Sequence, residues 1–126
     1  MTTIKSYTDI EQSKKLAEIL PIESADYFHA PDAGIVATEP YKLNEDDETV
    51  ITAYKGAIPC WSLAALLKYL SEIKAQVYTP ILFSSEGKWI LQFAEYGHGN
   101  VCEVSSDNPV DACVNMIIKL SKLKML

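Results

Sequence analysis

The residues best suited to catalysis in this 126-residue sequence are a cysteine and a histidine. Cys60 lies just ahead of a predicted helix, where amide dipoles can stabilise a thiolate, and His98 lies between two glycines. An imidazole near the thiol would act as a general base, with Asp107 or Asn108 orienting the ring. Such a set would make a small cysteine-dependent hydrolase or transferase. No enzyme signature surrounds Cys60, however, and a small thiol beside Trp61 is also typical of a protein core.

Other patterns for metal binding or acid–base catalysis are weak in the sequence. His29, Asp32 and Glu39 have suitable chemistry for a metal ion, but their spacing matches no ligand motif. Acid–base catalysis needs one shielded carboxyl group and one solvated carboxylate, whereas Glu95 and Glu103 both look exposed. No glycine-rich phosphate loop leads into a helix. We therefore predict no catalytic residue, no metal site and no cofactor.

The charge of the sequence argues against nucleic-acid binding. The net charge is −6, and all 11 basic residues are lysine. Nucleic-acid binders use a basic face to neutralise phosphates and arginine for bidentate contacts. Residues 1–48 carry 11 acids against 4 lysines, whereas residues 49–126 carry 6 acids and 7 lysines. The sequence therefore predicts a partner that is not a nucleic acid, and an acidic inhibitor that mimics nucleic acid is one alternative.

One acidic run has a higher charge density than its surroundings. A solvated connection between elements is the simplest interpretation of such a run. The functional interpretation is a contact for a basic protein partner, with a nearby tyrosine as an aromatic anchor. The candidate partner-binding residues are Tyr41, Glu45, Asp46, Asp47 and Glu48.

Two helices are predicted from their capping residues. Residues 8–11 read Thr-Asp-Ile-Glu, a capping box whose helix should run to about Leu20. A second helix begins at Ser62, and its leucines follow helical spacing. On its far face, Lys68 and Glu72 are placed to form an ion pair.

A third helix opens at Asn108, which is followed by a proline and then by an acid in the first turn. Its apolar stripe is wider than one face, because Met116, Ile118 and Leu123 lie beside the inward positions. Either the helix is central to the fold, or this part of it meets a partner or a second copy of the chain. Self-association through these residues is therefore a second partner prediction.

The C-terminal half also predicts a three-stranded antiparallel meander. Strands at 77–84, 88–96 and 101–105 are joined by two glycine-bearing turns. Pro80 suggests that the first of them lies at an edge or is broken at that residue. Two weaker strands are predicted at 35–38 and 49–54. Residues 1–126 are therefore expected to form a single α+β domain in which three helices pack on a mainly antiparallel sheet.

Cysteine usage and hydropathy indicate the compartment. The 3 cysteines are odd in number and form no CxxC pair, so we interpret them as reduced thiols. The N-terminus lacks the apolar segment of a secretory signal, and no apolar stretch is long enough to span a membrane. A cytoplasmic protein without membrane association is expected.

Two segments, IPCWSLAALLKYL at 58–70 and DNPVDACVNMIIKL at 107–120, carry a resemblance to a known group. The Pro-x-Trp-Ser-Leu helix start and the Asp-Asn-Pro-x-Asp-Ala start of the last helix resemble small uncharacterised proteins of Bacteroidetes. Those proteins are often encoded in phage-like or mobile regions. The resemblance covers about half of the chain and implies the helix starts and the fold, but no activity.

These observations favour a non-enzymatic, acidic, cytoplasmic domain that binds a protein partner, as an accessory factor of a mobile element. The alternatives are the cysteine-dependent hydrolase or transferase using Cys60 and His98, and the acidic mimic of nucleic acid. The partner itself is not identified by the sequence.

Overall fold

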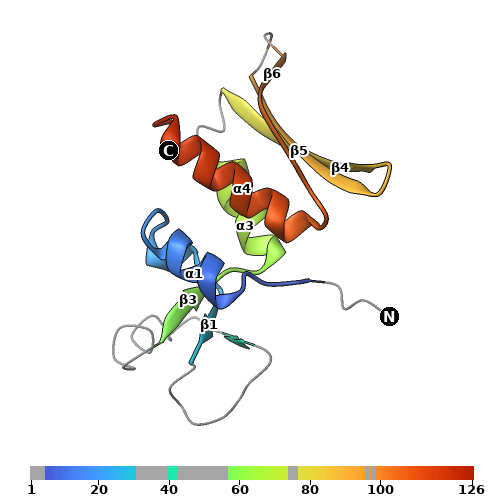
Figure 1. Cartoon of the computed structure of the whole chain (residues 1–126). Helices are drawn as coiled ribbons and strands as arrows, with labels where there is room; N and C mark the ends of the chain where they lie inside the picture. The colour runs from blue at the N-terminus through green and yellow to red at the C-terminus, as the bar shows by residue number, and fades with distance from the viewer. Residues whose placement is uncertain (1–4, 31–39, 43–56, 74–76, 96, 98) are drawn as a thin grey trace.

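A computed structural model of the chain describes residues 5–30, 40–42, 57–73, 77–95, 97 and 99–126. Within these ranges it contains three α-helices, a short 3₁₀ helix and two antiparallel sheets (Figure 1). The predicted α+β class is confirmed. The helices are α1 (Ile10–Ala17), η1 (Ile22–Ser24), α3 (Leu63–Glu72) and α4 (Pro109–Lys122).

The predicted meander is present, with β4 (Tyr78–Ser85), β5 (Lys88–Glu95) and β6 (Gly99–Ser106) in that order across the sheet. Between β4 and β5, Glu86 and Gly87 both have positive φ angles, 52° and 79°. This is the backbone of the two-residue hairpin turn that matches the twist of a strand pair. Because β4 is an edge strand, the prediction for its proline is also confirmed.

A second sheet was not predicted in this form. Its strands are β1 (Tyr27–His29), β2 (Tyr41–Lys42) and β3 (Ile58–Cys60), in the order β2-β1-β3. Strands of two or three residues are too short to show an alternating pattern in the sequence. The strands predicted at 35–38 and 49–54 lie outside the described residues.

The helix caps follow the sequence closely, with one shift. Ser62 caps α3 and Asn108 caps α4, as predicted. The α1 cap is Asp9, which forms a capping box with Gln12, so the predicted box is wrong by one residue. Thr8 is instead buried, and its hydroxyl bonds to the Ser13 hydroxyl, the Cys60 thiol and the Trp61 amide rather than to an amide at the helix start. α1 also ends at Ala17, before the predicted end at Leu20.

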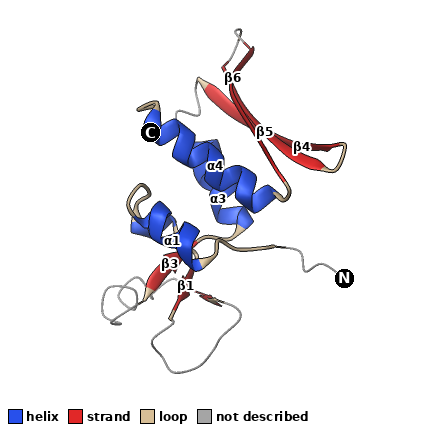
Figure 2. Ribbon diagram, viewed as in Figure 1, coloured by secondary structure: helices blue, strands red, loops and turns tan. Residues whose placement is uncertain are grey.

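The core lies between the meander and the pair α3 and α4, which together cover one face of that sheet (Figure 2). α4 is central, because its stripe packs against β5 and α3. Met116 is 0% exposed and belongs to this core, so the prediction that it contributes to a self-association surface is wrong. Ile118 is half-buried and Leu123 is 53% exposed. No helix in the described ranges is both long and apolar enough to cross a membrane.

Candidate functional site

Cys60, the predicted nucleophile, ends β3 in the interior of the protein and is 0% exposed. Its thiol lies 3.4 Å from the Thr8 carbonyl oxygen and 3.5 Å from the Thr8 hydroxyl. Burial raises the pKa of the Cys60 thiol, and this outweighs the lowering effect of hydrogen bonds from Thr8 and Ser13. The surroundings therefore favour the neutral thiol over the thiolate that a nucleophilic cysteine needs.

A histidine that was not predicted for this role, His29, shares a hydrogen-bond acceptor with Cys60. The His29 ring donates from Nε2 to the Thr8 carbonyl at 2.9 Å, and the same carbonyl accepts from the Cys60 thiol. His98 lies outside the described residues, so its place relative to Cys60 stays a prediction. Sequence reasoning missed His29 in this role because it lies 31 residues before the cysteine.

The two residues predicted to orient the imidazole have other partners. Asp107 forms an ion pair with Lys88, and Asn108 caps α4 through the Asp111 amide. The described residues therefore do not bring Cys60, Asp107 and Asn108 together. They also contain no group of three metal-ligating side chains.

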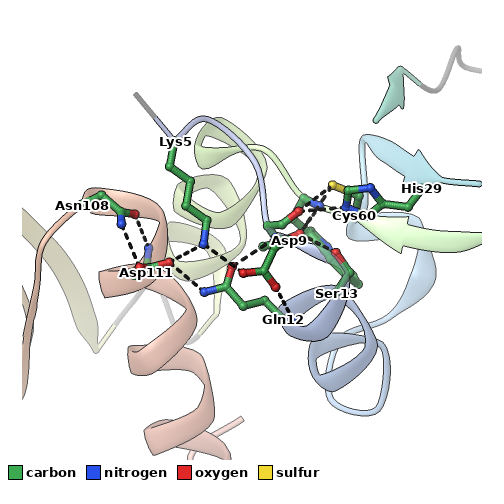
Figure 3. A network of polar contacts seen from close by, with 10 residues as sticks. Lys5, Asp9, Gln12, Ser13, His29, Cys60, Asn108 and Asp111 are labelled. Atoms are coloured by element: carbon green, nitrogen blue, oxygen red, sulfur yellow. Dashed lines mark hydrogen bonds and ion pairs between the residues drawn. The ribbon is translucent and has the colours of Figure 1, made fainter. Parts of the chain in front are cut away.

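The residues Thr8, Ser13, His29 and Cys60 form a compact set of hydrogen bonds that we call the Thr8 cluster (Figure 3). The Thr8 hydroxyl lies 2.8 Å from the Ser13 hydroxyl and accepts the Trp61 amide at 3.1 Å. No fully buried polar side-chain atom in the described residues lacks a partner. Pairing of this kind fixes α1 against β1 and β3.

A second polar network ties the N-terminal segment to the last helix (Figure 3). Lys5 donates to the Asp111 carboxylate at 2.7 Å and to Asp9 at 3.3 Å, and Gln12 donates to Asp111 at 2.7 Å. Burial raises the pKa of Asp111, but hydrogen bonds from Lys5, Gln12 and Asn108 outweigh it and hold the pKa below the ordinary value of 3.8. This network also holds elements together.

A groove of about 580 Å³ lies between η1 and α3. We call it the η1–α3 groove. Small apolar residues line part of it, and the charged groups of Glu23, Asp26, Lys68 and Glu72 line the rest. Three carboxylates and one ammonium give the described residues of this lining a net charge of −2 at neutral pH. The ion pair predicted between Lys68 and Glu72 is present, at 3.9 Å, with both groups exposed.

Hydrogen bonds at the end of the groove hold its two walls together. The Trp61 indole donates to the Ser24 hydroxyl at 2.9 Å. The Ser62 amide and hydroxyl both donate to the Asp26 carboxylate. Since Trp61 is fully buried, η1 is anchored directly to the core. The groove is therefore a built feature of the fold rather than a gap between loosely placed segments.

The sequence did not single out this groove as a site. Of the predicted partner-binding residues, Tyr41 lies in β2, and Glu45, Asp46, Asp47 and Glu48 lie outside the described residues. The two signals that pointed toward the groove were the acidic excess of residues 1–48 and the polar face of the second helix. The sequence does not show that the acidic N-terminal segment lies against the polar face of the second helix, because only the fold brings the two together.

Similarity to other proteins adds no functional residue to these features. The resemblance to small Bacteroidetes proteins at 58–70 and 107–120 is not tested and stays a prediction. No family model, no curated protein and no solved structure matches the chain.

Proposed function

We propose that the protein is a non-enzymatic binding protein and that its partner is a basic protein. The observation that carries this proposal is the η1–α3 groove, whose described residues combine an apolar lining with a net charge of −2. Apolar contact supplies binding free energy, and complementary charge supplies orientation and partner choice. The acidic run at 45–48 has the same sign and would add to the attraction.

The surroundings of Cys60 support a binding role over the cysteine-dependent enzyme. Its thiol is fully buried, and its neighbours are committed to one another. A role as a cytoplasmic accessory factor of a mobile element is part of the same proposal, and it rests on the sequence resemblance alone.

Affinity capture from host lysate tests the proposal. The baits are the wild-type chain, a variant with residues 45–48 replaced by serine and asparagine, and a variant carrying Glu23→Gln and Glu72→Gln. We expect basic proteins that are captured by the wild type, elute as salt is raised, and are depleted with at least one variant. Identical protein lists for all three baits would contradict the proposal.

A further inference from the structure

We infer that the η1–α3 groove binds a short segment of a protein partner in which an aliphatic side chain is flanked by lysine or arginine. This inference rests on the proposed function and names the part of the partner that is recognised. The groove volume of about 580 Å³ lies within the usual range for sites that hold a ligand of a few side chains. It suits a peptide segment rather than an extended flat interface.

The apolar half of the lining explains the aliphatic side chain. Ala25, Ala64 and Ala65 bring only methyl groups to the groove, and Ile73 closes it with a larger side chain. Small residues from two elements leave space that a partner's leucine or isoleucine can fill. Removing such a side chain from water is favourable in proportion to the apolar area covered.

The charged half of the lining explains the basic flanks. Both oxygens of Asp26 accept hydrogen bonds from Ser62, and Glu72 is paired with Lys68. Glu23 is exposed and has no ion-pair partner among the described residues. It is therefore the carboxylate that is free to accept a cation from outside.

Tyr69 gives the groove an aromatic surface for the same cation. Its side chain is half-buried in the lining, and burial raises the pKa of its hydroxyl, so the ring carries no negative charge at neutral pH. An ammonium or guanidinium over an aromatic face is attracted by the ring quadrupole. Glu23 and Tyr69 thus line one groove with a carboxylate and an aromatic ring, both of which attract a lysine or arginine side chain.

Titration of the ¹⁵N-labelled full chain with a synthetic peptide tests this inference. The probe is the capped peptide Gly-Lys-Leu-Lys-Gly, and its control carries acetyl-lysine, which keeps the stem and removes the charge. We expect the unmodified peptide to shift the amide signals of Ala25, Ala64, Ala65 and Ile73, and the acetylated peptide to shift them little. Equal shifts with both peptides would overturn the inference, as would shifts confined to the exposed β4 residues Ile81 and Phe83.

Three variants locate the binding. Glu23→Gln should weaken peptide affinity roughly two- to fivefold, the range for one exposed ion pair. Glu11→Gln removes the same charge from an exposed α1 position outside the groove and should leave affinity unchanged. Ala64→Leu keeps a good helix former and fills the groove, so it should abolish the groove shifts. Equal weakening by Glu11→Gln and Glu23→Gln would show non-specific attraction and overturn the inference.

Failure of the groove inference can be told apart from failure of the proposed function. If the peptide binds and only the replacement of residues 45–48 removes binding, the groove inference is wrong and the proposed function stands. If the peptide does not bind, the groove inference is also wrong. If, in addition, capture from lysate yields no basic protein, the proposed function fails as well.

Discussion

The Thr8 cluster and the η1–α3 groove both contact the segment 60–62 that leads into α3, yet among the described residues the polar groups of the cluster are paired and a carboxylate of the groove is not. In the cluster the Thr8 hydroxyl, its carbonyl and the Cys60 thiol are all paired and buried. In the groove Glu23 is exposed without an ion-pair partner among the described residues. Buried polar groups that are satisfied stabilise a fold, whereas exposed charges beside apolar surface are available to a ligand. Whether a polar group can bind a ligand here therefore depends less on its residue type than on whether it already has a partner within the protein.

The largest expected effect is on the rate at which the cysteines are labelled. A reactive Cys60 would contradict the comparison between a structural cluster and a binding groove. Burial raises the pKa of Cys113 from 9.0 to about 12, which lowers its thiolate fraction at pH 7 roughly a thousandfold. Burial also raises the pKa of Cys60. Iodoacetamide at pH 7 should therefore label both thiols far more slowly in the folded chain than in urea.

The measurement is peptide-resolved mass spectrometry of the labelled chain over time. Cys102 is also a buried free cysteine, and its labelling rate is the internal reference for the labelling rates of Cys60 and Cys113. Labelling of Cys60 faster than in the unfolded chain would support the cysteine-dependent enzyme and contradict a purely structural role for the Thr8 cluster.

The next effect is on stability. Thr8→Val keeps the shape of the side chain but removes the hydroxyl that bonds to Ser13 and accepts the Trp61 amide. Leaving buried partners unsatisfied costs about 1–3 kcal/mol of unfolding free energy. Urea denaturation measures the loss. Ser71→Ala is the control, because it deletes an exposed hydroxyl bonded to a helix carbonyl and should change stability little.

Thr8→Val also separates the two regions. Peptide binding to the groove should be retained, since Thr8 does not line it. An unchanged unfolding free energy would show that the Thr8 cluster does not stabilise the fold as its pairing implies.

A smaller effect is expected from the second network, and it depends on pH. Because the folded pKa of Asp111 lies below its ordinary value of 3.8, its contribution to stability is present above that value and is lost as pH falls through the folded pKa. Asp111→Asn should cost about 1 kcal/mol at pH 7 and less in acid. Asp107→Asn is the matched control, since that carboxylate is 81% exposed. Equal losses of unfolding free energy for Asp111→Asn at pH 7 and in acid would contradict a stabilising role for the Asp111 carboxylate.

The two regions also differ in how far the sequence predicts them. Caps are local, so Ser62 and Asn108 were found from three or four neighbouring residues. The shift from Thr8 to Asp9 at α1 has a tertiary cause, because both residue types can cap and only burial beside β3 directs Thr8 elsewhere. The turn between β4 and β5 was visible because its backbone requires glycine.

Neither the Thr8 cluster nor the groove could be read from spacing. Ser24 and Trp61 are far apart in the sequence, and the hydrogen bond between them brings η1 to α3. The run of polar and apolar residues at 21–26 has no periodicity that indicates a wall of a groove. Sites assembled from short irregular segments are fixed by tertiary contacts, which are the part of the fold that local patterns do not encode.

The smallest expected effect is also the clearest test of the role of charge. It is a rise in peptide affinity, whereas the groove variants Glu23→Gln and Ala64→Leu lower that affinity. Lys68→Gln removes the one cation among the described residues of the groove lining and takes the net charge of those residues from −2 to −3. The exposed pair with Glu72 contributes little, so stability should change by less than about 0.5 kcal/mol. Affinity for the lysine-containing peptide should rise roughly twofold, because Glu72 becomes free to accept a second cation.

Lys14→Gln provides the comparison, since it changes the net charge of the chain by the same amount at an exposed α1 position that does not line the groove. If attraction were a property of overall charge, both variants would tighten binding equally in the same titration. If it belongs to the groove, only Lys68→Gln does so, and the gain disappears when Ala64→Leu is added. An equal increase in peptide affinity for both lysine variants would show that the net charge of the whole chain attracts the peptide, and that the groove does not bind it specifically.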